Sequence, residues 1–151
     1  MTSLSTPTQS SSLQIGDYLC MNGDRPCKIV NKTTSKTGKH GGAKIHFTCI
    51  DIFTDKKYEH LLMSTQNADV PTVTKNDYQL LSIDGNDVSY LDDKGNDMSD
   101  LVMPNLCEKD IELDQNLRNA FENGDENGDE IYIQVISAMN ITAIKGFRVI
   151  K

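Results

Sequence analysis

Short apolar segments separated by polar turns recur along much of this 151-residue chain, and they limit the folds open to it. Asn-Gly-Asp at 22–24, Asp-Gly-Asn at 84–86 and Lys-Gly-Asn at 94–96 carry residues that favour tight reversals between strands. Short strands at this spacing favour small antiparallel barrels over a parallel sheet with crossover helices. The sequence therefore predicts an all-β fold, mainly strands with one helix.

The helix is expected over residues 110–121, where apolar residues return at helical spacing. Acidic residues crowd its start, where the helix dipole favours them, and Gly124 stands where a C-terminal cap belongs. We interpret 123–128, which partly matches a calcium loop, as a solvated loop after the helix. The apolar face consists of Leu113, Leu117, Ala120 and Phe121.

A strand with a change of phase is predicted at 43–53. Ile45, Phe47 and Cys49 alternate with polar neighbours, as in a half-buried strand. Ile50 and Ile52 continue the apolar set one position late. This slip predicts a β-bulge or a fully buried strand end near Ile50.

The distribution of charge suggests two domains. Residues 1–83 carry nine Lys/Arg and seven Asp/Glu, a net charge of +2, whereas 84–151 carry six and fifteen, a net charge of -9. The Ser/Thr-rich segment 1–13 is typical of a disordered tail. We therefore expect a tail over 1–13, a first domain over 14–83 and a second over 84–151.

The cysteines and histidines do not suggest a metal site. Cys20, Cys27, Cys49 and Cys107 form no Cys-x-x-Cys pair, and the three histidines lack ligand spacing. Without a secretory signal or an apolar run long enough to span a membrane, we expect reduced cysteines, a cytoplasmic location and no membrane partner.

The segment 36–44 is the strongest functional candidate, because it holds three lysines and three glycines and lies in an acid-free stretch of an acidic protein. It lacks the spacing of a phosphate-binding P-loop. Two interpretations from the residues stay open. One is a hairpin tip with solvated lysines. The other is a loop whose glycines on both sides hold Lys39 out in solvent, where its ammonium meets a phosphate backbone or a modifying enzyme.

The motif and its flanks resemble the eukaryotic translation initiation factor 5A family. TSKTGKHG (34–41) closely resembles the hypusine loop of that family. The similarity extends in order and spacing over roughly residues 13–140. It includes RPCKIV (25–30), AKIHF (43–47), IDIFTDKKYE (50–59), ADVP (68–71), NDYQLLSI (76–83) and VISAM (135–139).

The resemblance implies an N-terminal SH3-like barrel followed by a C-terminal OB-fold barrel. It also implies that Lys39 is the residue converted to hypusine by deoxyhypusine synthase, with spermidine as donor, and by deoxyhypusine hydroxylase. No separate cofactor is expected. The residues that would present Lys39 to RNA and to the modifying enzymes are Lys36, Thr37, Gly38, His40, Gly41, Gly42 and Lys44, with Lys28 and Lys32 as a possible extension of the basic surface.

The implied function is a hypusine-dependent translation factor, not an enzyme. It would bind the ribosome beside peptidyl-tRNA and promote peptide-bond formation at slow sequences such as proline runs, and also termination. The alternative is a general RNA-binding or scaffolding protein whose loop lysine needs no modification. A monomer or a weak dimer is expected. Gly42 departs from the family, which usually has histidine there.

Overall fold

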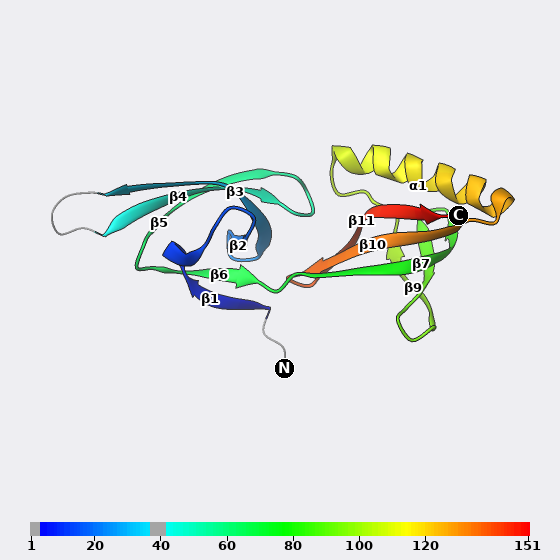
Figure 1. Ribbon diagram of the computed structural model, residues 1–151, viewed down its shortest axis with the longest axis horizontal. Helices are drawn as coiled ribbons and strands as arrows, with labels where there is room; N and C mark the ends of the chain where they lie inside the picture. The colour runs from blue at the N-terminus through cyan, green and yellow to red at the C-terminus, as the bar shows by residue number, and fades with distance from the viewer. Residues whose placement is uncertain (1–3, 37–41) are drawn as a thin grey trace. The chain divides into compact units, whose positions relative to one another are not determined.

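The computed structural model describes residues 4–36 and 42–151 of the chain. These residues form two compact units, Met1–Thr72 and Val73–Lys151, and each has its own apolar core. Figure 1 shows that both units are built mainly from strands, with one long helix in the second. The predicted all-β class is confirmed.

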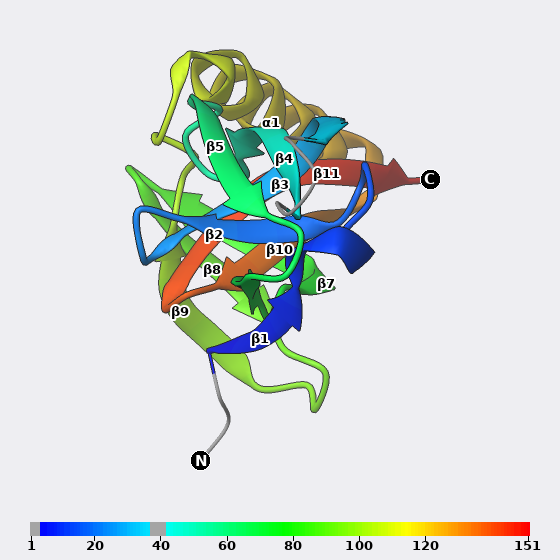
Figure 2. The ribbon, with the colours of Figure 1, turned by 90° about the vertical axis from the view of Figure 1, so that its left-hand side faces the viewer.

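Unit 1 is a half-barrel of the SH3-like type. Its described strands form a four-stranded antiparallel sheet in the order β2-β3-β4-β5 and a separate pair, β1-β6. In Figure 2 these strands face the viewer. Its elements are β1 (Ser5–Gln9), η1 (Ser10–Ser12), β2 (Tyr18–Met21), β3 (Arg25–Lys36), β4 (Ala43–Asp51), β5 (Lys57–Met63) and β6 (Asn67–Pro71).

Of the two alternatives predicted near Ile50, a β-bulge and a fully buried strand end, the bulge lies instead in the opposite strand, β3. The register of β3 against β4 shifts between Ile29 and Asn31, which leaves Val30 as the extra, exposed residue. Strand β4 keeps its inward phase because the buried position after Cys49 is Asp51 rather than an isoleucine. The predicted buried strand end describes β4 better, since Thr48, Cys49 and Asp51 are all buried and only Ile50 between them is half-buried. The apolar pattern misled at Ile50 because the charged side chain of Asp51 occupies the core position.

The tail predicted over 1–13 is wrong for its described part. Strand β1 pairs with β6 from Ser5 to Gln9, and the turn η1 follows directly. Ser10 and Leu13 are buried. Polar composition suggested disorder, but the open edge of β6 supplies the backbone hydrogen bonds that an isolated polar segment would lack.

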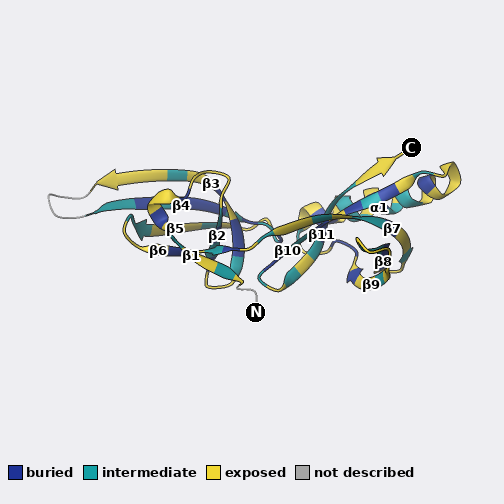
Figure 3. Ribbon diagram, turned by 60° about the horizontal axis from the view of Figure 1, so that its bottom comes forward, coloured by how far each residue is buried: buried dark blue, intermediate teal, exposed yellow. Residues whose placement is uncertain are grey.

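Unit 2 is a five-stranded antiparallel barrel with the helix packed on it, an OB-fold. Its strand order is β11-β10-β7-β8-β9, and β9 also contacts β11. Figure 3 shows the alternation of buried and exposed residues along these strands. Its elements are β7 (Thr74–Asp84), β8 (Asp87–Leu91), β9 (Asp97–Val102), α1 (Glu108–Asn127), β10 (Glu130–Ala138) and β11 (Ile141–Ile150).

Helix α1 is longer than predicted. Leu117 is fully buried and Phe121 packs against the core, as the spacing required. The helix continues through 123–127, however, so the predicted loop is wrong. Gly128, with φ of +75°, takes the left-handed capping position instead of Gly124. Gly124 lies inside the helix, where a β-carbon would stand 3.4 Å from Ile131.

The boundary predicted at 83 falls inside strand β7, which pairs with β8 and β10 of unit 2. The structure divides between Thr72 and Val73. The charge pattern misplaced the division because residues 73–83 carry one lysine and one aspartate, so their net charge does not reveal their unit. Among the described residues, no helix has both the length and the hydropathy to span a membrane.

Candidate functional site

The hairpin of β3 and β4 carries the lysine-rich segment. Lys36 pairs with Ala43 and Ser35 pairs with Lys44, so the two strands bring their ends together on either side of residues 37–41. Thr37, Gly38, Lys39, His40 and Gly41, predicted as the modified lysine and its neighbours, lie outside the described residues.

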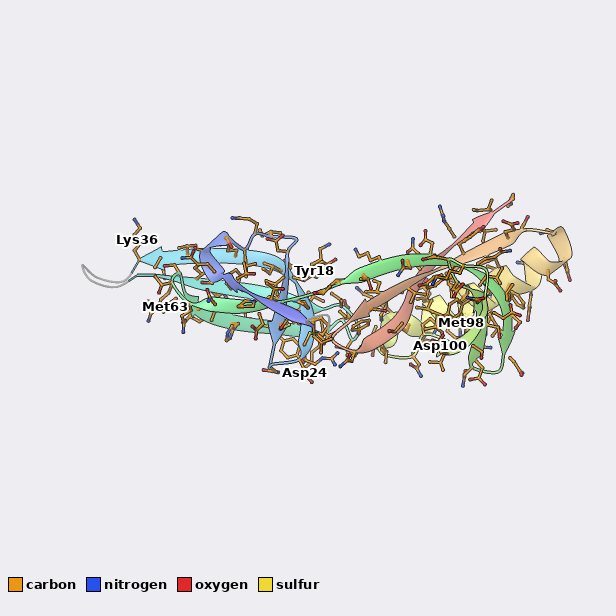
Figure 4. The ribbon with its side chains drawn as sticks, turned by 90° about the horizontal axis from the view of Figure 1, so that it is seen from below. Tyr18, Asp24, Lys36, Met63, Met98 and Asp100 are labelled. Atoms are coloured by element: carbon orange, nitrogen blue, oxygen red, sulfur yellow. The ribbon has the colours of Figure 1, made fainter. Side chains whose placement is uncertain are left out.

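The described lysines near this segment are available to an external partner. Lys36 is exposed, and Figure 4 shows its side chain pointing away from the hairpin. Lys44 is half-buried beside Met63, its neighbour on β5. Within the part of the chain that the structure describes, neither side chain makes an ion pair or a hydrogen bond. Lys28 is likewise exposed. No described ion pair neutralises any of these three cations within residues 4–36 and 42–72.

Lys32 behaves differently from the other predicted basic residues. Its ammonium donates hydrogen bonds to the carbonyl oxygens of Leu13, at 2.6 Å, and Ser11, at 3.3 Å. Its donors are therefore directed into its own chain. It faces the core side of the sheet, since it stands opposite Phe47 in the register. Lys32 is better described as a structural contact of the hairpin than as part of an open basic surface.

Sequence reasoning missed a second contact at the hairpin, made by Ser10. Its hydroxyl donates to the Met63 carbonyl at 2.6 Å, and its backbone N–H donates to the Gln66 carbonyl at 2.9 Å. The Ser64 N–H then donates to the Ala43 carbonyl at 2.8 Å, which ties this turn to β4. The only signal available in the sequence was the apolar Leu13 after a serine run.

Gly42 has room for a side chain. A β-carbon placed there would lie 3.4 Å from the Ser64 hydroxyl oxygen and 3.7 Å from the Met63 methyl carbon, which are ordinary packing distances. Gly42 is also not among the described residues with positive φ. The local backbone therefore does not require glycine.

The opposite end of the hairpin is fixed by a buried ion pair. The Arg25 Nε atom donates to Asp51 Oδ2 at 2.7 Å, while the N–H groups of Phe53 and Thr54 donate to Oδ1 at 2.8 and 3.1 Å. Burial by itself would raise the pKa of Asp51, but these hydrogen bonds prevail and hold the pKa below its ordinary value. The carboxylate is therefore stabilised in its charged form.

The cysteines of unit 1 are structural. Burial raises the pKa of Cys20 and Cys49 to about 11 and that of Cys27 to about 12, so these thiols stay protonated near neutral pH. Among the described residues, no disulfide bond joins any of the four cysteines. No group of three or more potential metal ligands occurs within residues 4–36 and 42–151.

The paired tyrosines of unit 2, Tyr78 and Tyr90, do not form an open aromatic platform for nucleic-acid bases. Tyr90 is buried and stacks on Tyr78, with ring centroids 4.9 Å apart. Its hydroxyl donates to Asp100 at 2.5 Å. Burial and this carboxylate raise the pKa of Tyr90. Rings packed against each other beside an acidic group are unsuited to stacking with single-stranded bases, which usually occurs in basic grooves.

Comparison with known families places the chain among translation factors. Residues 3–66 match the family described as "Translation initiation factor 5A-like, N-terminal". Residues 72–148 match "Eukaryotic elongation factor 5A hypusine, DNA-binding OB fold". The chain belongs to the translation factor 5A family, which carries a hypusine modification and is not a family of enzymes.

Individual relatives agree over nearly the whole chain. Eukaryotic translation initiation factor 5A-2 of Caenorhabditis elegans is 44% identical and covers 95% of this chain and 84% of the relative. The factor 5A-1 of Saccharomyces cerevisiae is 42% identical, with coverage of 94% and 84%.

Solved structures extend the similarity to the fold. A family protein from Naegleria fowleri has a TM-score of 0.88 at 41% identity and covers 97% of this chain and 99% of that one. Eukaryotic translation initiation factor 5A from Methanococcus jannaschii has a TM-score of 0.69 at 27% identity, with coverage of 97% and 96%. The resemblance found in the sequence is confirmed.

Proposed function

We propose that this chain is a hypusine-dependent translation factor in which Lys39 is the modified residue. It binds the ribosome beside peptidyl-tRNA and promotes peptide-bond formation at slow sequences such as proline runs, and it assists termination. It works in the cytoplasm as a monomer or a weak dimer. Its modifying enzymes are deoxyhypusine synthase and deoxyhypusine hydroxylase.

The observation that carries this proposal is the pair of uncommitted cations beside residues 37–41. Lys36 and Lys44 lie on the two arms of one hairpin, and neither has an anionic partner within the described structure. Cations that are not neutralised internally remain free to contact phosphate groups. Membership of a family defined by hypusine supports modification at this hairpin.

The chemistry of the modification suits the task. An aminobutyl arm on Lys39 lengthens the side chain and adds a second basic amine, so reach and positive charge both increase. Because proline fixes its backbone torsion, a proline-containing nascent chain is a poor reactant. A cationic arm that steadies the acceptor end of the tRNA would favour reaction by orientation, without chemistry of its own.

The remaining predicted residues have supporting roles in this proposal. Lys36, Thr37, Gly38, His40, Gly41, Gly42 and Lys44 present Lys39 to the modifying enzymes and to RNA, and Lys28 extends the basic surface. The acidic unit 2, with net charge -9 over residues 84–151, is unsuited to binding free RNA by itself.

Intact-mass measurement tests the site. We expect protein co-expressed with both modifying enzymes to gain the mass of one aminobutyl group and one oxygen, and peptide sequencing to assign this mass to Lys39. Lys39→Arg keeps the charge but should gain nothing. A mass increase that persists in this variant would contradict the assignment.

A reconstituted translation assay tests the function. Modified protein should accelerate synthesis of a reporter with a proline run but leave a proline-free reporter nearly unchanged. Unmodified protein and Lys39→Arg should both be inactive. If unmodified protein is fully active, the alternative of an RNA-binding protein that needs no modification is favoured instead.

A further inference from the structure

We propose that residues Gln9–Leu13 form a brace across the β3–β4 hairpin, and that Lys32 is the positioning residue that fastens it. The brace holds the arms of the hairpin in the geometry that a modifying enzyme recognises. The statement about recognition by a modifying enzyme rests on the proposed function, whereas the brace and the role of Lys32 in it do not.

One end of the brace is fixed to the end of β5. Ser10 is fully buried, and its hydroxyl and its N–H donate to the carbonyls of Met63 and Gln66. The Gln9 side-chain amide adds a longer bond to the Ser64 carbonyl, at 3.4 Å. Met63 lies opposite Lys44 in the register, so this end is level with the lysine-bearing part of β4.

The other end of the brace is fixed to β3 by Lys32. Its ammonium reaches the carbonyls of Leu13 and Ser11, while the Leu13 side chain is buried in the core of unit 1. Lys32 stands opposite Phe47, whose side chain belongs to the same core. The segment therefore connects β5 to β3 on the core side of the sheet, and β4 lies between these two strands.

The arm beyond Lys32 depends on this attachment. Residues 33–36 are all exposed, so the burial that fixes the base of β3 does not extend to its end. Lys32 is the last residue of β3 that is still half-buried. The Lys32 ammonium, which donates to two carbonyl oxygens, therefore fixes the position of β3 at the point where its exposed end begins.

The chemistry of Lys32 makes the proposal testable by substitution. Lys32→Met retains the apolar stem but removes every donor. Lys32→Arg supplies a planar group with several donors that can span two neighbouring carbonyl oxygens. Lys57→Met is the matched control, since Lys57 is exposed on β5 and the same substitution removes the same charge.

Amide hydrogen exchange measures the brace without reference to function. In Lys32→Met we expect exchange at Ser64 and in residues 33–36 and 43–45 to become roughly tenfold faster, because hydrogen bonds to a charged donor are lost. The core amides of Ile29 and Cys49 should change little. Lys32→Arg should restore most of the protection, and Lys57→Met should match the wild type.

Two outcomes would overturn the brace. If Lys32→Met accelerates exchange equally at Ile29, Cys49 and the hairpin arms, Lys32 only stabilises the unit as a whole. If no amide changes, the two bonds of Lys32 do not position anything. Each result is read from the exchange pattern alone.

Kinetics with deoxyhypusine synthase then test the functional consequence. We expect Lys32→Met to raise KM for the protein substrate about fivefold while kcat stays within about twofold, because a mispositioned hairpin weakens recognition rather than the chemical step. Lys32→Arg should recover the wild-type KM. An unchanged KM in Lys32→Met would overturn this part. If the wild type itself is not modified, the proposed function fails, and the exchange result still decides the brace.

Discussion

The two ends of the β3–β4 hairpin are built in opposite ways. At the anchored end, formed by Arg25–Cys27 and Asp51–Thr54, a buried carboxylate collects three hydrogen bonds. At the tip end, formed by Ser35–Lys36 and Gly42–Lys44, the lysine side chains have no ion pair within the described structure, and the backbone leaves room for an additional side chain.

This difference separates stability from recognition within one pair of strands. A charge that is satisfied inside the protein holds the fold but cannot bind a partner. A charge that is left unsatisfied contributes little to folding and remains available for binding. The anchored end should therefore control the stability of unit 1, and the tip end should control its interactions.

The largest effect is expected from Asp51→Ala. This change leaves the Arg25 guanidinium and the N–H groups of Phe53 and Thr54 without their acceptor, and we expect it to lower the free energy of unfolding of unit 1 by about 3 kcal/mol. Amide exchange at Ile29 and Phe47 would report the loss, with Ile133 of unit 2 as the internal reference. Asp24→Ala, at an exposed turn, is the control and should change little.

The comparison would fail if Asp51→Ala lowered protection in unit 2 as much as in unit 1. It would also fail if the loss stayed below that of the Asp24→Ala control. A double-mutant cycle adds Arg25→Met alone and together with Asp51→Ala. The difference between the combined loss of stability and the sum of the two single losses measures the interaction between Arg25 and Asp51.

A smaller effect is expected from pH. The pKa of Asp51 is lower in the folded protein than its ordinary value of 3.8, so its contribution is fully present above that pH and disappears as the pH falls through the folded value. We expect unit 1 to become less stable by this route as the pH falls below 3.8, because the unfolded chain then takes up the proton more readily than the folded protein does. Asp51→Asn should flatten the pH dependence of exchange at Ile29, and an equally steep dependence in this variant would contradict the assignment.

Sequence reasoning recovered the fold class and the family because both depend on local patterns. Turn residues, strand alternation and the helical spacing that includes Leu117 are all set within short windows. It failed where a residue's partner lies far along the chain. Asp51 occupies a core position because Arg25 lies beside it, and no local pattern indicates that pairing.

The same limitation explains the errors at the N-terminus and at the boundary. Ser10 belongs to a polar run and becomes ordered through carbonyl groups more than fifty residues away. Strand β7 belongs to unit 2 because its partner β10 lies near the end of the chain. Local composition cannot report either contact. At the candidate site, local composition pointed to a group of lysines. It could not show that the Lys32 ammonium is hydrogen-bonded to the Leu13 carbonyl of its own chain.

At the tip end, Gly42→Ala should stabilise unit 1 slightly, by about 0.5 kcal/mol. The new methyl group fits against Ser64 and Met63, and alanine restricts the unfolded chain more than glycine does. Gly23→Ala is the contrasting variant, because φ is +87° there and the substitution should destabilise by about 1 kcal/mol. Chemical denaturation followed by circular dichroism measures both. If Gly42→Ala destabilises unit 1 as much as Gly23→Ala does, the backbone at Gly42 requires glycine, and the expected difference between the tip end and a tight turn is wrong.

The smallest effect on stability is expected from Lys36→Ala, which should stay within about 0.3 kcal/mol of the wild type because the side chain is exposed and makes no described contact. Its effect should appear in recognition instead. Loss of one cation should weaken binding to ribosomes about threefold at low salt, and the difference should shrink as salt screens the interaction. Lys57→Ala, which removes a charge elsewhere on unit 1, should bind as the wild type does. If both variants weaken binding equally, only the net charge of the unit matters, and the hairpin tip has no special part in recognition.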